Sequence, residues 1–169
     1  MKKLTLVRHA KSSWKDPLLS DFDRPLNSRG KQDLPLMAER IVEFGLEPDL
    51  LLSSGAVRAI TTAEQIARSA DYPEQRIIEV PELCGAGVET LLNILQGQSD
   101  HYRHIMVVGH NPTLESLGFY LTHEAIDKLP TCGIMHIPLS ITSWDELSES
   151  CGTLERFDAP KMHYQYSPG

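Results

Sequence analysis

The alternation of short apolar segments with helical segments constrains the fold of this chain more than any other feature. The apolar segments favour β-structure and have the length of buried strands. They cover residues 4–7, 49–53, 76–80 and 104–108. Apolar residues at helical spacing follow them, in segments that end near residues 44, 70, 95 and 121. Strands that alternate with helices in this way predict an α/β fold around a largely parallel sheet.

Residues at the ends of the helical segments predict where the helices begin and end. Asn27 or Ser28 can cap the first helix, and Gly45 is suited to end it. Pro35 lies inside this first helical pattern and predicts either a late start or a kink, because proline removes one helical hydrogen bond. Thr113 can cap the last helix.

The pattern changes after residue 130. Residues 134–141 and 152–157 have strand character with little helix between them, which indicates that the sheet gains antiparallel members there. The tail, residues 159–169, has no periodicity, and we expect it to be packing or disorder, including His163, Tyr164 and Tyr166. No linker divides the chain, and a length of 169 residues fits one domain, residues 1–169.

Composition narrows the classes of partner and the compartment. The chain has 16 Lys and Arg against 23 Asp and Glu, a net charge of -7, so neither a nucleic acid nor an anionic membrane is the expected partner. Its three cysteines, Cys84, Cys132 and Cys151, are not spaced for a disulfide framework or a zinc knuckle. No apolar run has the length of a membrane span or a signal peptide. These features predict a cytoplasmic protein with reduced thiols.

Charged residues follow three of the predicted strands. Arg8 and His9 come directly after the first strand, Arg58 lies at the helix start that follows the second, and His110 follows the fourth. Ligands of open α/β sheets bind beyond the carboxyl ends of the strands, so these loops should converge. Guanidinium groups and helix N-termini are suited to phosphate oxygens. The sequence therefore predicts a phosphate site at this edge.

Each of these residues also has a simpler interpretation. Arg58 could lie on a helix surface and pair with Glu64 or another acid, and His110 could be a turn residue beside Gly109 and Pro112. Taken together, three charged loops at one sheet edge favour function, because burying cations side by side is costly without an anion.

Four ordered motifs in the chain resemble the histidine phosphatase superfamily. They are LVRHA at residues 6–10, DRPLNSRG at 23–30, SSGAVRAITTA at 53–63 and VGHN at 108–111. Within that superfamily the chain is similar to the small SixA-type phosphohistidine phosphatases, which often open with RHAKS, as at residues 8–12 here. The resemblance covers roughly residues 4–121. It implies a three-layer, phosphoglycerate mutase-like sandwich with helices on both faces of the sheet.

The resemblance also implies roles for the matching residues. His9 would be the nucleophile, Arg8 and Arg58 phosphate ligands, and His110 a phosphate ligand that stabilises the transition state. Arg24 matches a further arginine that lines the pocket in small members. The alternative interpretation of Arg24 is that it is a loop arginine paired with Asp21 or Asp23.

The chemistry of these groups agrees with those roles. Imidazole attacks phosphorus only as the neutral base, and neighbouring arginines should lower the pKa of His9 further below its ordinary value of about 6.5. Phosphoryl transfer mostly requires positioning and neutralisation of the phosphoryl oxygens, which Arg8, Arg58 and His110 could provide. No Asp and Glu cluster has metal-ligand spacing, so we expect neither a metal nor a cofactor.

A general acid is missing from its expected place. Mutase and bisphosphatase members carry a glutamate within a Gly-aromatic-Glu-Gly-like run, and residues 81–89 contain no such run. Glu82 and Glu89 are candidates, although Glu89 is better explained as a solvated helix-start residue. An alkoxide leaving group needs an acid, whereas a protonated phosphoimidazole leaves as neutral imidazole.

These observations leave three hypotheses. The leading one is removal of phosphoryl groups from phosphohistidine on a partner protein, because a site without an acid suits cleavage of a P–N bond. The second is a phosphatase or pyrophosphatase for a small phosphorylated metabolite, with Glu82 or another carboxylate as the acid. The third is a phosphate-binding module without catalysis, which would not need the nucleophile His9.

Overall fold

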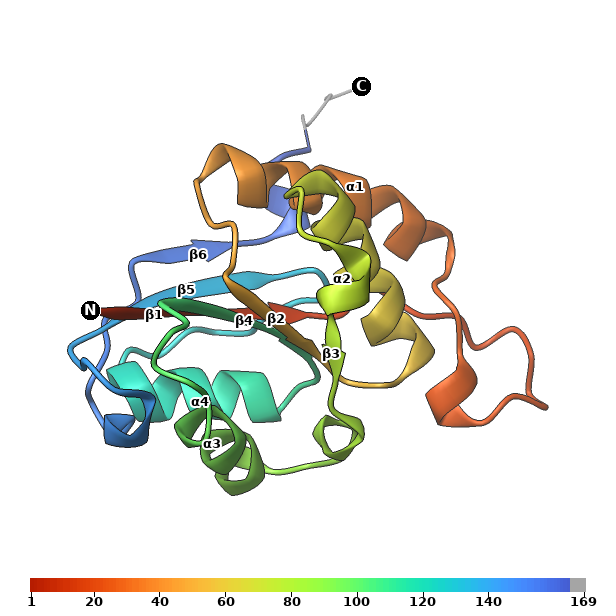
Figure 1. The fold of residues 1–169 in the computed structure, drawn as a ribbon. Helices are drawn as coiled ribbons and strands as arrows, with labels where there is room; N and C mark the ends of the chain where they lie inside the picture. The colour runs from red at the N-terminus through yellow and green to blue at the C-terminus, as the bar shows by residue number, and fades with distance from the viewer. Residues whose placement is uncertain (165–169) are drawn as a thin grey trace.

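The computed structural model describes residues 1–164 and shows a six-stranded mixed sheet between two layers of helices (Figure 1). The strands are β1 (Lys2–Arg8), β2 (Leu50–Ser53), β3 (Ile78–Glu79), β4 (His104–Gly109), β5 (Ile134–Leu139) and β6 (Arg156–Asp158). Their order across the sheet is β3-β2-β4-β1-β5-β6. The first four are parallel, β5 is antiparallel to β1, and β6 is antiparallel to β5. The predicted α/β fold with added antiparallel strands is confirmed.

Two α-helices cover each face of the sheet (Figure 1). They are α1 (Ser28–Glu43), α2 (Val57–Ser69), α3 (Val88–Gln96) and α4 (Thr113–Thr122). Helices α1 and α2 contact each other on one face, and α3 and α4 contact each other on the opposite face. Short 3-10 helices lie at Asp21–Asp23, Glu74–Arg76, Pro81–Leu83, Trp144–Glu146 and Pro160–Met162. This is the three-layer sandwich that the family resemblance implied.

The hydrophobic core is divided by the sheet into two clusters. Alternate residues of each central strand enter opposite clusters: Ile105 and Val107 pack towards α3 and α4, and Met106 and Val108 pack towards α1 and α2. Every residue of β4 is buried, as expected for an interior parallel strand with helices on both faces. The sheet is therefore a rigid support for the loops at its carboxyl edge.

The first helix begins where one of the predicted caps places it. Asn27 is the N-cap, and its side-chain oxygen accepts from the Gly30 amide at 2.8 Å. Helix α1 starts at Ser28 and contains Pro35, so a late start is wrong. Gly45 follows the helix with a φ of +68°, a left-handed conformation that glycine adopts without strain, which confirms the predicted stop.

Other predicted boundaries are wrong. Thr113 does not cap α4: it is the first helical residue, and its hydroxyl donates to the Ala86 carbonyl at 2.6 Å. The third strand is limited to Ile78–Glu79, because the 3-10 helix Glu74–Arg76 takes its predicted start and Val80 caps the next 3-10 helix. The last strand moves to Arg156–Asp158, and Gly152 keeps only an isolated bridge to β5.

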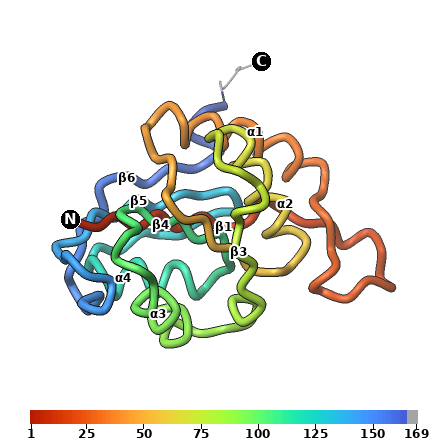
Figure 2. The backbone as a smooth tube through the Cα atoms, in the orientation of Figure 1, coloured from red at the N-terminus to blue at the C-terminus, as the bar shows by residue number. Residues whose placement is uncertain are grey.

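The long loop between β1 and α1, residues 9–27, projects from the carboxyl end of β1 (Figure 2). The two ends of this loop are joined by a hydrogen bond from the Asn27 amide to the Lys11 carbonyl, at 3.0 Å. Gly30 lies against the same carbonyl, so closely that a Cβ there would overlap it. A glycine at this point lets α1 pack directly on the backbone that follows His9.

No helix within residues 1–164 is both long and apolar enough to cross a bilayer. The tail from Ala159 is packed as far as Tyr164, whose hydroxyl donates to Asp33. Tyr166 lies outside the described residues.

Candidate active site

The three loops that carry the predicted site residues leave the sheet at the same level. Arg8 is paired with Gly109 across β1 and β4, and Ser53 with Val108 across β2 and β4. The His9 amide then donates to the Gly109 carbonyl at 3.1 Å. Because these parallel strands are adjacent, their carboxyl ends bring the loops together, as predicted from the sequence.

The loops enclose a cavity of about 510 Å³. It is lined by Arg8, His9, Asp21, Arg58, His110, Asn111, Pro112 and Thr113 and by residues 83–87. Four of the five predicted site residues, Arg8, His9, Arg58 and His110, therefore share one cavity. The fifth, Arg24, is not part of its lining.

His9 is a buried, neutral imidazole with one nitrogen committed to the backbone. Its Nδ1 lies 2.7 Å from the Ala10 carbonyl oxygen. A carbonyl can only accept, so Nδ1 carries the hydrogen and Nε2 keeps its lone pair. Burial lowers the pKa of His9 to about 3; the Ala10 carbonyl opposes this shift, and His110, Arg58 and Arg8 add to it. His9 is thus unprotonated at neutral pH, as a nucleophile must be.

His110 lies beside His9, with 5.0 Å between the ring centroids. Its Nε2 is 2.8 Å from the Ser54 hydroxyl oxygen, at the end of β2. Burial, followed by the charges of Arg58 and Arg8, lowers the pKa of His110 to about 4. Both imidazoles are neutral, so the positive charge in the cavity comes from the guanidinium groups of Arg8 and Arg58.

Arg8 has an incomplete set of hydrogen-bond partners. Its Nη1 donates to the Leu129 carbonyl at 3.0 Å, but its buried Nε–H has no acceptor among the described residues. Burial lowers the pKa of Arg8, and the Glu115 carboxylate opposes that shift. A buried donor without an acceptor is costly. The Arg8 guanidinium therefore lines the cavity with one of its donors unsatisfied.

Arg58 is in the first turn of α2, and its side chain is nearly buried. Its Nη1 donates to the Asp21 carbonyl at 2.7 Å, and its Nη2 to the Asp21 carboxylate at 3.0 Å. Arg58 therefore does pair with an acid, as its simpler interpretation expected, but the acid is Asp21 and not Glu64, and the side chain is buried and not on a helix surface. Burial raises the pKa of Asp21, but Arg58 and Arg24 lower it by more, so the carboxylate is ionised.

Arg24 is held within its own loop. It donates to the Ser13 carbonyl at 3.0 Å, to the Asp21 carboxylate at 2.7 Å and to the Ser12 hydroxyl. Its guanidinium also stacks on Trp14, 3.3 Å from the ring centroid. Of the two interpretations of Arg24, the ion pair with Asp21 is the one present in this structure. Arg24 reaches the cavity only through Asp21, which binds both arginines.

Sequence reasoning missed the residues that position these groups. Thr62 is fully buried; it accepts from the Ala10 amide at 2.9 Å and donates to the Arg58 carbonyl at 2.7 Å, so it joins the His9 loop to α2. Asn111 donates to the same Leu129 carbonyl as Arg8, at 2.9 Å. Thr62 lies in the sequence motif at residues 53–63 and Asn111 in the motif at 108–111. Their place in these motifs is the one signal in the sequence that could have indicated them.

The carboxylates that were candidates for a general acid do not line the cavity. Glu82 and Glu89 are both absent from its lining, although residues 83–87 form one wall. Among residues 1–164, Asp21 is the one acidic residue that lines it. In the same part of the chain, no group of three His, Cys, Asp or Glu side chains is arranged to hold a metal ion. The expectation of metal independence stays a prediction.

Comparisons with known proteins agree with this geometry. The profile of the histidine phosphatase superfamily (branch 1) matches residues 4–91. An uncharacterized chloroplastic protein of Arabidopsis thaliana is 33% identical over 153 residues, which are 86% of this chain and 70% of that protein. An uncharacterized protein of Mycobacterium tuberculosis is 30% identical over 167 residues, which are 92% of this chain and 100% of that protein.

Solved structures show the same relationship. The provisionally assigned phosphohistidine phosphatase SixA of Agrobacterium tumefaciens has a TM-score of 0.81 at 29% identity, covering 94% of this chain and 98% of that one. The protein histidine phosphatase SixA complexed with tungstate has a TM-score of 0.80 at 23% identity, covering 95% and 98%.

This chain belongs to the histidine phosphatase superfamily. Its fold is that of the SixA-type, phosphoglycerate mutase-like members, which confirms the resemblance found in the sequence. Phosphatase is the class of enzyme that this relationship supports.

Proposed function

We propose that this phosphatase takes a phosphoryl group onto Nε2 of His9 and that its substrate is phosphohistidine on a partner protein. The observation that carries the first part is the hydrogen bond from His9 Nδ1 to the Ala10 carbonyl. It leaves Nε2 unprotonated in a cavity with two guanidinium groups. Such a pairing of nucleophile and cations suits phosphoryl transfer.

The reaction divides into two displacements at phosphorus. In the first, Nε2 of His9 forms a bond to phosphorus while the P–N bond to the substrate imidazole breaks. In the second, water attacks the phosphoryl group on His9 and the P–N bond to Nε2 breaks. Inorganic phosphate leaves, the proton of the water passes to the phosphate or to solvent, and His9 is regenerated as the neutral imidazole. Arg8, Arg58 and His110 would bind the phosphoryl oxygens and stabilise the charge that they carry.

The electrostatics of the cavity support a P–N rather than an alkyl P–O substrate. Asp21 is the one carboxylate in the lining, and it is ionised because Arg58 and Arg24 lower its pKa. An ionised carboxylate does not donate a proton. An alkoxide leaving group would therefore lack the general acid that typically contributes about 10²–10⁴-fold. A protonated phosphoimidazole needs little such help, because imidazole itself is a stable neutral leaving group.

Two other hypotheses are less well supported. A phosphatase or pyrophosphatase for small metabolites would use Glu82 or another carboxylate as acid, but Glu82 does not line the cavity. A phosphate-binding module without catalysis would not need an unprotonated nitrogen on His9. Proteins that match this fold include SixA, named as a protein histidine phosphatase, which also favours a phosphohistidine substrate.

The substrate class is tested by a panel of kcat/KM measurements. The panel contains a histidine-phosphorylated protein, free phosphohistidine, phenyl phosphate and phosphoserine. We expect phosphoserine to be slower than free phosphohistidine by at least about 10²-fold, and the phosphorylated protein to be the best substrate. Efficient turnover of phosphoserine that Glu82→Gln abolishes would show that the metabolite hypothesis is right.

A further inference from the structure

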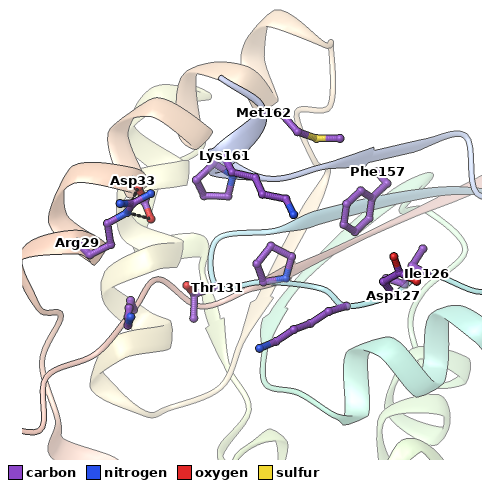
Figure 3. Close-up of a pocket in the computed structure, with 12 residues that line it drawn as sticks. Arg29, Asp33, Ile126, Asp127, Thr131, Phe157, Lys161 and Met162 are labelled. Carbon is purple, nitrogen blue, oxygen red and sulfur yellow. Dashed lines mark hydrogen bonds and ion pairs between the residues drawn. The ribbon is translucent and has the colours of Figure 1, made fainter. Parts of the chain in front are cut away.

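A second cavity lies away from the His9 pocket and is the larger of the two, with a volume of about 620 Å³ (Figure 3). It is formed by the start of α1, residues 126–131 before β5, and residues 157–162 around the end of β6. None of its lining residues lines the His9 pocket. Its volume is within the range of about 300–1,000 Å³ that is common for small-molecule sites.

Hydrogen bonds fix the walls of this cavity. Tyr164 donates to Asp33 of α1, and His163 Nε2 lies 2.6 Å from the Asp158 carboxylate. These contacts hold the segment after β6 to α1 and to the end of β6. The other wall includes Lys128 and Pro130, and between them the Leu129 carbonyl accepts from both Arg8 and Asn111. These hydrogen bonds hold the segments that form the cavity in place.

The charge around the cavity is opposite in sign to that of the whole chain. Lys11, Lys128, Lys161 and Arg29 line it against two acids, Asp33 and Asp127, whereas the chain as a whole has 23 acidic and 16 basic residues. Arg29 is already bound to Asp33, with Nε 3.1 Å from the carboxylate. The three lysines form no ion pair within residues 1–164.

An apolar wall faces these cations. In Figure 3, Lys161 extends between the Arg29–Asp33 pair and Phe157. Ile126 and Met162 continue the apolar lining, and Met162 is 57% exposed. Together these side chains give the cavity one cationic side and one apolar side. The combination suits a molecule that has an anionic head and a flat apolar body.

We propose that this cavity is a second binding site and that its ligand is a small organic anion with an aromatic or similarly flat body. The anionic group would lie against Lys11, Lys128 and Lys161, and the body would pack on Phe157 and Met162. Cations placed around an apolar pocket give both affinity and orientation. This inference does not depend on the chemistry at His9.

The test uses 8-anilinonaphthalene-1-sulfonate, an anion with an aromatic body, and the double variant Lys128→Glu/Lys161→Glu. Both lysines are exposed, so the variant should fold normally. The matched control is Arg76→Glu/Arg103→Glu, which makes the same change of net charge at a hollow of about 490 Å³ elsewhere on the surface. We expect the dissociation constant to rise about tenfold in the lysine variant and to change less than about twofold in the control.

Amide NMR shifts then locate the bound probe. We expect shifts at Thr131, Phe157 and Met162. Equal weakening in both double variants, or shifts confined to residues 14–22 or 83–87, would overturn the proposal.

Discussion

Two pairs of neighbouring histidines lie on or directly beyond the strands of the same sheet, and only one of them is suited to catalysis. His9 and His110 follow the carboxyl ends of β1 and β4, with ring centroids 5.0 Å apart. His104 and His136 lie further back, on β4 and β5, with centroids 5.3 Å apart. Burial lowers the pKa of all four, to about 4 in His104 as in His110.

The difference between the pairs is in what their nitrogens bind. His104 Nδ1 donates to the Glu47 carbonyl, so its Nε2 accepts from the Thr5 hydroxyl at 2.6 Å. His136 Nδ1 then donates to the same hydroxyl oxygen at 2.7 Å. No nitrogen of His104 is left available. His9 keeps Nε2 without a hydrogen-bond partner in the described chain, in a cavity beside two arginines.

This comparison teaches that burial and a lowered pKa do not by themselves identify a catalytic histidine. Structural networks shift pKa values as strongly as active sites do. The distinguishing features are an available lone pair, neighbouring cations and an opening large enough for a substrate. The predictions below test that distinction, from the largest expected effect to the smallest.

Replacing one histidine from each pair should have the largest and most unequal effect on activity. We expect His9→Ala to lower kcat/KM for phenyl phosphate by on the order of 10⁴-fold, because it removes the nucleophile. His104→Ala should leave kcat/KM within about threefold when assayed below its melting temperature. Comparable losses in both variants would mean that the two pairs are not functionally distinct.

The two arginines bound to Asp21 should also differ. Arg58→Ala should lower kcat/KM by about 10²–10³-fold, because Arg58 lines the cavity and would bind phosphoryl oxygens. Arg24→Ala should cost about tenfold or less, since Arg24 acts through Asp21 and the loop. Arg58→Lys keeps the charge but loses the planar guanidinium, so its loss of kcat/KM should lie between those of Arg58→Ala and Arg24→Ala. A larger loss in Arg24→Ala would show that Arg24 contacts the substrate.

Removing the Thr5 hydroxyl should affect stability and not catalysis. Thr5→Val leaves two buried histidine nitrogens without their shared partner, which typically costs about 1–3 kcal/mol. Urea unfolding measures this change, with kcat/KM as the second readout. A fall in kcat/KM at unchanged stability would mean that the inner pair takes part in the site.

The stability of the protein should fall as the pH decreases from about 6.5 to 4. The pKa of His104 is about 4 in the folded protein and about 6.5 in the unfolded chain. Between these values the unfolded chain binds a proton that the folded one does not, so acid favours unfolding. Above pH 6.5 His104 contributes no pH dependence.

The variant His104→Gln isolates this contribution. Urea unfolding of both proteins at pH 7 and pH 5 should show a loss that is smaller in the variant by roughly 2 kcal/mol. The remaining loss should come from His9, His110 and His136, whose pKa values are lowered in the same direction. Identical losses in the two proteins would mean that His104 is not a buried neutral group.

The smallest expected effect is that of Glu82→Gln. Glu82 lies outside the cavity lining, so kcat/KM for a phosphohistidine substrate should change by less than about twofold. A loss of tenfold or more would make Glu82 part of the reaction.

Much of the fold could be predicted because its signals are local. Apolar runs specified β1, β2 and β4, and the rule that ligands bind beyond the carboxyl ends of parallel strands placed Arg8, His9 and His110 together. The sequence did not reveal the ion pair between Asp21 and Arg58, which are 37 residues apart, because Asp21 lies in the β1–α1 loop, which has no periodicity. The prediction that Thr113 caps α4 was wrong for a similar reason: the Thr113 hydroxyl donates to the carbonyl of Ala86, which is distant in sequence.

The central claim is that His9 carries the phosphoryl group during the reaction. The direct measurement is a rapid quench in alkali with a labelled phosphoryl donor, followed by mass analysis of the peptide that contains His9. We predict an acid-labile phosphoryl group on that peptide, lost in His9→Ala and retained in His104→Ala. Absence of the label in the native protein during turnover, or equal labelling in His9→Ala, would contradict the account.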